Sequence, residues 1–419
     1  MFYDKTTLTN GLDIVSEHIP GVRSITLGIW FRVGSRDEQK NQLGLSHFME
    51  HMMFKGTDLR SALDISMAFD SMGAVLNAFT SKEYTCYYAS ILDEHLDAAV
   101  EILADMLQHS QFAPDAIKTE REVVIEEIAR YEDEPSDHVG DIFTEAMFPS
   151  DQLGRSVLGT RQTVGAFEHE SCAAYLSRHY HAGNAVMVAA GNVDHEALVA
   201  LAERFFATLP GGTANTRGAV LDADRQLLTF EQKDTEQAHL LYGMPGIPLG
   251  DVDRFAGHLM DTALGGPMSS RLFQEVREKR GLAYAVYAAT SPYIRASQFF
   301  VYVGTRPSNL REVLGVLRSE IALLLDSGVG AEELTRVQEY TVGHLVLSAE
   351  STRDHMLRLG SNAVQDLEIL SLDENIERYR AVSQSDIERV AERVLSAEPT
   401  VAVISPLDRA ELEAALADA

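Results

Sequence analysis

The residues best suited to chemistry lie in one short stretch of the chain, His47–His51 (HFMEH). Residues four apart lie on the same face of an α-helix, so a helix here would direct the rings of His47 and His51 to one point, with Glu50 beside it. Two imidazoles and a carboxylate can supply three ligands to zinc and leave the fourth position for water. A neighbouring carboxylate that does not bind the ion can take a proton from that water. The stretch therefore predicts zinc-assisted hydrolysis.

A five-residue pattern of this kind also recurs by chance, and an ordinary half-buried helix with hydrogen bonds between histidine and glutamate is the alternative. A second acidic stretch favours the metal. Glu120 and Glu127 lie seven residues apart, which places them two turns apart on one face of the long helix expected after Pro114. One of these carboxylates can bind the ion while the other orients a histidine. By itself, such an acidic run would indicate only a solvated helix face.

Several elements must hold these side chains in place. Alternating apolar residues over Ile25–Val33 predict a half-buried strand. We expect a helix over Asn41–Lys55 that is closed by Gly56, and two strands, Val75–Phe79 and Tyr84–Ile91, joined by a short polar turn. Strands mixed with helices in this way predict an α+β domain with helices packed over a sheet.

The chain also contains a weak internal repeat. The clearest linker signal, Leu209–Gly212, lies near its middle, which predicts domains over 1–212 and 227–419 with a linker over 213–226. Both halves end with a helix, a buried strand and a helix, as tandem duplication would give. These elements are Ser171–His179, Ala185–Ala190 and His195–Phe205 in the first half, and Ser385–Leu395, Val401–Ile404 and Arg409–Leu416 in the second. The second half lacks the HxxEH pattern, so only the first should bind metal.

Composition narrows the class of partner. The chain has 35 Lys and Arg against 63 Asp and Glu, a net charge of −28, which argues against nucleic-acid binding. This charge favours cationic partners, or serves only solubility. No apolar stretch is long enough to cross a membrane, and Met1–Asn10 has no signal-peptide pattern, so a cytoplasmic protein is expected. The two cysteines, Cys86 and Cys172, are predicted to be reduced structural thiols.

The order HxxEH inverts the common HExxH zinc motif and is typical of inverzincins. Together with its flanking residues, it makes the chain resemble the M16 (pitrilysin) metallopeptidase family, in particular short bacterial members related to the β subunit of mitochondrial processing peptidase. The matching stretches cover both halves: Gly44–Thr57, Asn77–Ala89, Glu120–Pro135 and Gly265–Tyr287.

The resemblance implies a role for each matching residue. It places one zinc ion per chain on His47, His51 and Glu127, makes Glu50 the general base, and makes Glu120 an acid that supports the ligands.

Members of this family bind a peptide as an added strand at a sheet edge. The resemblance assigns substrate contacts to Asn77 and Ala78, which would hold the peptide backbone, and to Arg277 and Tyr284 from the second half. Without it, Asn77 would be a turn or strand-end residue, Arg277 a surface helix residue and Tyr284 a core aromatic residue.

The resemblance further implies two homologous α+β domains, each a mainly antiparallel sheet packed with helices, closing like a clamshell on a peptide. It predicts a zinc endopeptidase acting on short or unfolded peptides, with basic substrates favoured by the acidic charge. A homodimer is expected, with a heterodimer containing an inactive homologue as the alternative. The rival function is a non-catalytic partner subunit, but such subunits typically lose motif residues, and all five are present here.

Overall fold

The computed structural model describes residues 2–220 and 224–417. The chain packs into two compact units, each built from three separate segments. The first unit comprises Met1–Ala129, Arg155–Gly218 and Ser348–Ser371, and the second comprises Arg130–Gly154, Ala219–Leu347 and Leu372–Ala419.

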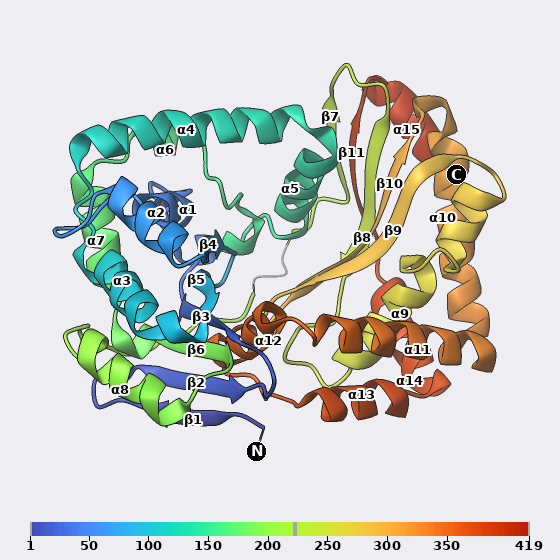
Figure 1. Cartoon of the computed structure of the whole chain (residues 1–419). Helices are drawn as coiled ribbons and strands as arrows, with labels where there is room; N and C mark the ends of the chain where they lie inside the picture. Colours follow the sequence, from blue (N-terminus) through green and yellow to red (C-terminus); the bar gives the residue numbers. More distant parts are fainter. Residues whose placement is uncertain (1, 221–223, 418–419) are drawn as a thin grey trace. The chain divides into compact units, whose positions relative to one another are not determined.

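The first unit is organised around a six-stranded sheet (Figure 1). In spatial order its strands are β1 (Asp4–Thr7), β2 (Asp13–His18), β6 (Ala185–Gly191), β3 (Ser24–Phe31), β5 (Thr85–Leu92) and β4 (Val75–Thr80). Only β2 and β6 pair in parallel; the other neighbours are antiparallel. The expected strands are therefore present, and β4 lies at the edge of the sheet.

The larger core of this unit lies between one face of the sheet and a layer of helices. Ile25, Leu27 and Ile29 of β3 point into it, as the alternation predicted. The prediction that this strand is half-buried is wrong, because the helix Thr352–Val364 covers its other face and β3 is buried on both. The helices of the first unit are α1 (Leu45–Met52), α2 (Ala62–Ser71), α3 (Leu96–His109), α4 (Pro114–Asp133, which continues into the second unit), α6 (Arg161–Gly165), α7 (His169–His179), α8 (His195–Phe206) and α12 (Thr352–Val364).

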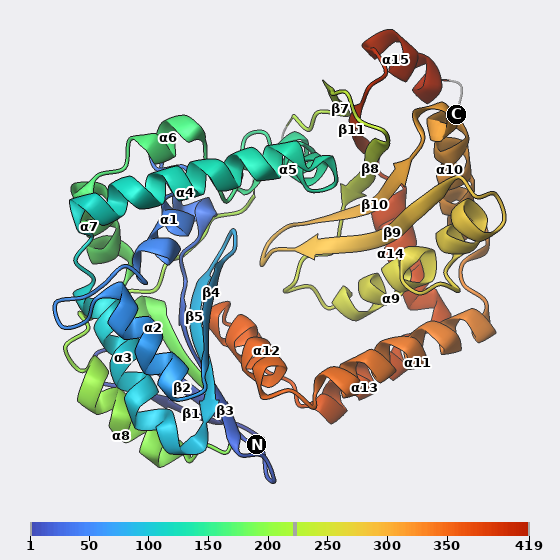
Figure 2. The same ribbon diagram turned by 45° about the horizontal axis from the view of Figure 1, so that its top comes forward.

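The other face of the sheet is covered by α12, which lies opposite α1, α2 and α3 (Figure 2). Trp30 and Val188 point to this face and pack with Met356 and Leu359 of α12. The approach is close, because a Cβ added at Gly360 would lie 2.1 Å from the Trp30 ring. A helix encoded far along the chain thus completes the first sheet.

The second unit repeats this plan with five strands. In spatial order they are β7 (Leu228–Gln232), β11 (Thr400–Ser405), β8 (Ala238–Pro245), β10 (Ser297–Thr305) and β9 (Ala283–Pro292). The pair β7–β11 is parallel and the others are antiparallel, the same sequence of pairings as in β2-β6-β3-β5-β4. The repeated topology confirms two α+β domains of one kind, as the weak internal repeat predicted.

The helices of the second unit come from both halves of the chain. They are α5 (Pro135–Met147), α9 (Arg254–Gly265), a π-helical segment η5 (Phe273–Glu278), α10 (Leu310–Ser327), α11 (Ala331–Ser348), α13 (Leu372–Ala381), α14 (Gln384–Leu395) and α15 (Arg409–Ala417). Short 3-10 turns occur at Ser35–Asp37, Asp93–His95, Gln152–Gly154, Ala182–Asn184 and Pro307–Asn309. None of the described helices combines the length and apolar composition needed to span a bilayer.

The two halves of the sequence exchange one helix each. From the first half, α5 packs on β11 and β8 of the second unit, and from the second half, α12 packs on β6 and β3 of the first. The strands in these two sets occupy equivalent places in the two sheets. The domain boundary at the linker 213–226 and the clamshell arrangement both stay predictions. The compact units do not follow chain order, because each contains a helix from the other half of the sequence.

Candidate metal centre

The short helix α1 presents the HFMEH residues. Phe48, Met49 and Met52 are buried in the larger core of the first unit, which fixes the rotation of the helix. The helix begins at Leu45 rather than at the expected Asn41, and it ends at Met52 rather than Lys55.

The start of α1 has a local cause. Gly44 adopts a left-handed conformation with φ of 86°, which a helix cannot continue through. The buried carboxylate of Glu38 accepts hydrogen bonds from the amides of Gly44 (2.8 Å) and Ser46 (2.7 Å). It thereby satisfies amide groups at the helix N-terminus that would otherwise lack partners.

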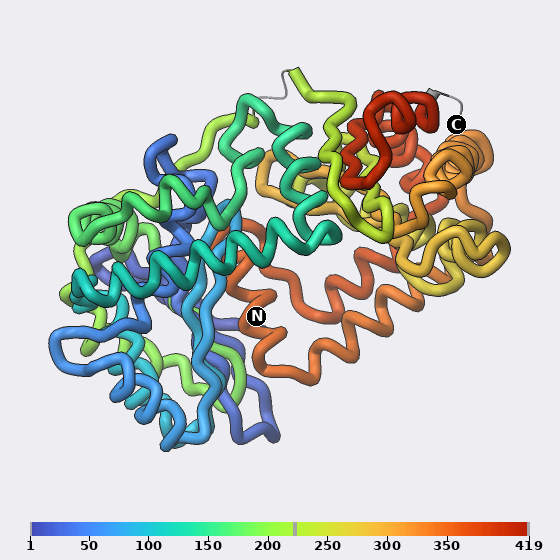
Figure 3. Tube along the Cα trace, turned by 90° about the horizontal axis from the view of Figure 1, so that it is seen from above, coloured from blue at the N-terminus to red at the C-terminus, as the bar shows by residue number. Residues whose placement is uncertain are grey.

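The long helix α4 supplies the two glutamates. It begins at Pro114, as predicted, and its residues Ile117, Val124 and Ile128 are buried. Glu120 lies on the same buried face and is 3% exposed, whereas Glu127 is partly exposed. Figure 3 shows α4 as a long, nearly straight tube. The apolar residues therefore orient both carboxylates through one rigid element.

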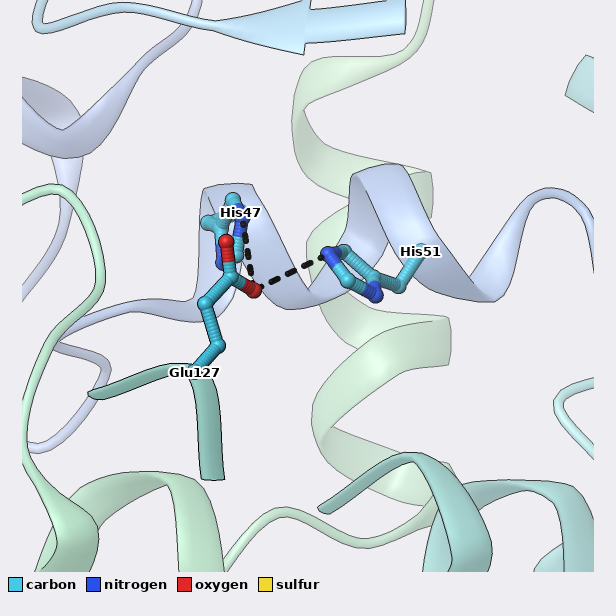
Figure 4. Close-up of side chains that lie close together, drawn as sticks. All are labelled: His47, His51 and Glu127. Atoms are coloured by element: carbon cyan, nitrogen blue, oxygen red, sulfur yellow. Dashed lines mark ion pairs between the residues drawn. The ribbon is translucent and has the colours of Figure 1, made fainter. Parts of the chain in front are cut away.

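His47, His51 and Glu127 come together in space. One carboxylate oxygen of Glu127, Oε2, lies 3.7 Å from Nε2 of His47 and 3.6 Å from Nε2 of His51. The candidate ligand atoms all lie within 4.8 Å of one another. Figure 4 shows the two rings on α1 and the carboxylate approaching them from the second helix. Glu120, the other candidate, contacts Nδ1 of His51 and is not among these ligand atoms.

These three residues fit a zinc ion. Ligand bonds of about 2.1 Å in tetrahedral geometry place neighbouring ligand atoms about 3.4 Å apart, close to the 3.7 and 3.6 Å that separate Glu127 from the two rings. Burial, followed by the charge of His51, lowers the pKa of His47 to about 4, so its ring is neutral and has a lone pair to offer. The other ring nitrogen of His47, Nδ1, is buried and has no hydrogen-bond partner among the described residues.

Glu120 and Lys55 hold the His51 ring in place through its Nδ1 atom, the nitrogen that does not face Glu127. This Nδ1 atom lies 2.8 Å from Oε1 of Glu120, and the ammonium group of Lys55 lies 2.6 Å from Oε2 of the same carboxylate. Burial alone would raise the pKa of Glu120, but the hydrogen bonds and charges of His51 and Lys55 hold it below its usual value. Burial likewise opposes charge on His51, yet the hydrogen bond to Glu120 and the nearby carboxylates raise its pKa. Glu120 thus orients His51 so that Nε2 faces Glu127.

Lys55→Met should weaken zinc binding about tenfold, because residues that orient the ligands typically contribute a factor of this size. The change removes the ammonium group that fixes Oε2 of Glu120, and leaves every ligand in place. Competition with a chromophoric chelator measures the affinity. Lys118→Met, at an exposed position on the same helix as Glu120, is the matched control. Equal affinity in the two variants would reduce Lys55 to a surface ion pair.

Glu50 lies beside the ligand set and is not part of it. Its Oε2 accepts a hydrogen bond of 2.6 Å from the hydroxyl of Thr80, the last residue of β4. Burial raises the pKa of Glu50, with the hydrogen bond from Thr80 and the charge of His51 acting in the opposite direction. A half-buried carboxylate with a raised pKa is well suited to accepting a proton.

Asn77 and Ala78 lie in the middle of the edge strand β4, at the place where an added strand would pair. The side-chain oxygen of Asn77 accepts a hydrogen bond from the amide of Ala78 at 2.8 Å. That amide is therefore directed away from β5 and toward the open edge, where the Asn77 side chain now occupies it.

Arg277 and Tyr284 form a pair within the second unit. The guanidinium carbon of Arg277 lies 4.3 Å from the ring centre of Tyr284 and 4.7 Å from that of Phe273. Arg277 also donates a hydrogen bond to the carbonyl oxygen of Tyr284 at 3.1 Å. Tyr284 is 76% exposed on the edge strand β9, so it is not the core aromatic residue that its sequence alone would indicate.

Sequence reasoning missed two residues of this centre. Lys55 follows His51 by four positions, so the spacing that pairs His47 with His51 extends to it. Thr80 follows the Asn77-Ala78 pair by two positions, but its contact with Glu50 depends on the packing of β4 against α1. The first signal was available in the sequence, and the second was not.

Known proteins show where this chain belongs. A family model described as Insulinase (Peptidase family M16) matches residues 13–161, and one described as Peptidase M16 inactive domain matches residues 166–340. An uncharacterized zinc protease of Streptomyces coelicolor is 43% identical over 412 residues, covering 96% of this chain and 89% of the relative. The uncharacterized zinc protease YmxG of Bacillus subtilis is 39% identical, covering 96% and 97%.

Solved structures show the same fold. A protease from Helicobacter pylori superposes with a TM-score of 0.89 at 21% identity, covering 96% of this chain and 99% of that chain. A peptidase M16 inactive domain from Pseudomonas fluorescens gives a TM-score of 0.91 at 19% identity, covering 97% and 99%. With family models matching both halves and relatives above 30% identity along nearly its whole length, the chain belongs to peptidase family M16.

Proposed function

We propose that this protein is a zinc metalloendopeptidase of the M16B kind that hydrolyses short or unfolded peptides. The observation that carries the proposal is the convergence of His47, His51 and Glu127 from two helices, with Glu50 beside them. The zinc proteases among its relatives support the choice of metal.

Each residue then has a distinct task. A zinc ion held by the three ligands would supply Lewis acidity, polarising the scissile carbonyl and making water acidic near neutral pH. Glu50 accepts the proton of the attacking water and passes it to the leaving amine. The hydroxyl of Thr80 keeps one oxygen of Glu50 fixed, so the other is directed to the water. Glu120 and Lys55 hold His51 in one orientation.

The edge of β4 is the proposed binding place for the peptide. A substrate strand would pair with this edge through backbone hydrogen bonds, which bind many sequences alike. The carbonyl of the substrate would replace the Asn77 side chain on the amide of Ala78. Arg277 and Tyr284 are proposed to donate hydrogen bonds to the peptide and to the oxyanion that forms during attack.

Further proposals concern substrate charge and assembly. The net charge of −28 favours encounters with basic peptides, which salt would weaken. Glu132, Asp133, Glu134 and Asp137 are candidate sources of this field. We also propose that the protein acts in the cytoplasm as a homodimer, with a heterodimer containing an inactive homologue as the alternative.

Chelation tests the proposal directly. A quenched fluorescent peptide should be cleaved by the purified protein, should resist cleavage after dialysis against a chelator, and should be cleaved again when one equivalent of zinc is added. Metal analysis in parallel should give one zinc per chain. If the zinc-loaded protein binds peptides without cutting any of them, the rival function of a non-catalytic subunit is correct.

Arg277→Ala should lower kcat/KM by about tenfold to a hundredfold, the usual contribution of a charged hydrogen bond, while zinc content stays unchanged. Steady-state kinetics and metal analysis measure the two quantities. Arg254→Ala is the matched control, because that guanidinium also stacks on a ring, Phe255, at 4.6 Å. Kinetics like those of the wild type would show that Arg277 serves only to pack Tyr284.

A further inference from the structure

A groove of about 560 Å³ lies beside the edge strand β4. Phe79, Tyr88, Arg353 and Ser361 are among the residues that line it. They come from β4, β5 and α12, so the groove belongs entirely to the first unit. Asn77 and Ala78, already proposed to hold the peptide backbone, also line it, but the candidate metal ligands do not.

The groove opens on the face of the sheet away from α1. Along a strand, successive side chains point to opposite faces. Thr80 points to α1, where it contacts Glu50, and Ala78 packs in the same core. Phe79 points the other way and packs with Trp30 and Tyr88 in the core that α12 covers. Asn77 shares the face of Phe79 because it lies two residues away.

A peptide strand added to β4 would follow the same alternation. Every second side chain would point toward the α1 face, where the metal centre lies. The side chains between them would point toward the α12 face, where the groove begins at Asn77 and Phe79. Substrate residues on the α12 face are therefore the ones that the groove can select.

The charge of the groove indicates which side chains it selects. Its lining includes Arg353 and Arg358 and no carboxylate. Arg358 is paired with Glu17 at 2.9 Å. Arg353 is exposed and stacks at 5.5 Å from the ring centre of Tyr88, and it has no acidic partner among the described residues. In a chain with a net charge of −28, this groove is a local positive site with aromatic walls.

We propose that the groove is a specificity subsite for an acidic side chain of the substrate, with Arg353 as the residue that recognises it. The proposal rests on the proposed function, because it takes the peptide to lie along β4. The carboxylate of an Asp or Glu would pair with the guanidinium, while its methylene groups contact Phe79 and Tyr88. The overall negative charge would favour the diffusional encounter with basic peptides. The subsite would select a single acidic residue once the peptide is bound.

A peptide library tests the subsite. Glu, Gln or Lys is placed at each position around the scissile bond of one cleaved peptide, and kcat/KM is measured for wild type and Arg353→Gln. Glu should be preferred over Gln by about twofold to fivefold, the range of an exposed charge pair, at positions that alternate with unaffected ones. Arg353→Gln should abolish the preference for Glu over Gln. Arg336→Gln, an exposed change of the same charge, should retain it.

Charge reversal sharpens the test. Arg353→Glu should invert the preference, so that the peptide with Lys at the selected position becomes the better substrate. Equal treatment of Glu and Gln at every position, or a preference that survives in Arg353→Gln, would overturn the subsite while the proposed function stands. If no peptide is cleaved, anisotropy of labelled peptides decides: tighter binding of the Glu peptide that depends on Arg353 supports the subsite, and equal binding of both peptides overturns it.

Discussion

Glu50→Gln should keep its zinc and lose turnover by about 10²- to 10⁴-fold, the usual contribution of a general base. The amide has the same shape as the carboxylate, and its oxygen can still accept the hydrogen bond from Thr80. It cannot accept a proton from water, so the attacking nucleophile is no longer generated. None of the three ligand atoms is altered, and zinc affinity should therefore stay close to that of the wild type.

Metal analysis and single-turnover cleavage of a quenched peptide measure the two halves of this prediction. Glu122→Gln is the matched control, because it makes the same chemical change at an exposed position of α4. Unchanged hydrolysis in Glu50→Gln would remove Glu50 from its role as base. Loss of zinc from this variant would instead make Glu50 a ligand.

His51→Ala should lose zinc, because two protein ligands remain where three are needed. It also removes the partner of Glu120, whose carboxylate is 3% exposed and would keep only Lys55. We expect zinc affinity to fall by at least about a hundredfold and cleavage to become undetectable.

Zinc titration followed by thermal unfolding provides a readout that does not depend on activity. Zinc should raise the melting temperature of the wild type, because an ion that binds only the folded state stabilises it. Zinc should leave the melting temperature of His51→Ala unchanged. His95→Ala, outside the centre, is the control. Full occupancy in His51→Ala would mean that the ligand set is wrong.

The sequence was most informative where local spacing decides the structure. The period of 3.6 residues places His47 and His51 on one face, and the same period places Glu120 and Glu127 on one face of α4. The sequence could not show which glutamate approaches the histidines, because that depends on how α4 packs across α1. The resemblance to the M16 family selected Glu127, and the structure brings its carboxylate within 3.7 Å of both rings.

Other features depend on contacts between distant residues and were beyond local patterns. Helix α1 begins four residues after the predicted start because Glu38 accepts hydrogen bonds from the amides of Gly44 and Ser46. The edge position of β4 follows from the order of the whole sheet. The groove requires α12 to lie under Trp30, although these segments are more than three hundred residues apart. The sequence could predict where each helix or strand lies and which of its faces is apolar. It could not predict which other elements pack against that face.

The reciprocal exchange of α5 and α12 has a consequence for biosynthesis. A ribosome that has completed β6 at Gly191 has made every strand of the first sheet, yet Trp30 and Val188 on its far face stay uncovered until α12 emerges after Thr352. During that interval the nascent chain exposes a broad apolar surface, the kind that attracts chaperones or promotes aggregation. Folding of the metal-binding half should therefore finish late in translation. Premature termination within the second half should yield an aggregation-prone fragment that binds zinc poorly rather than an active enzyme.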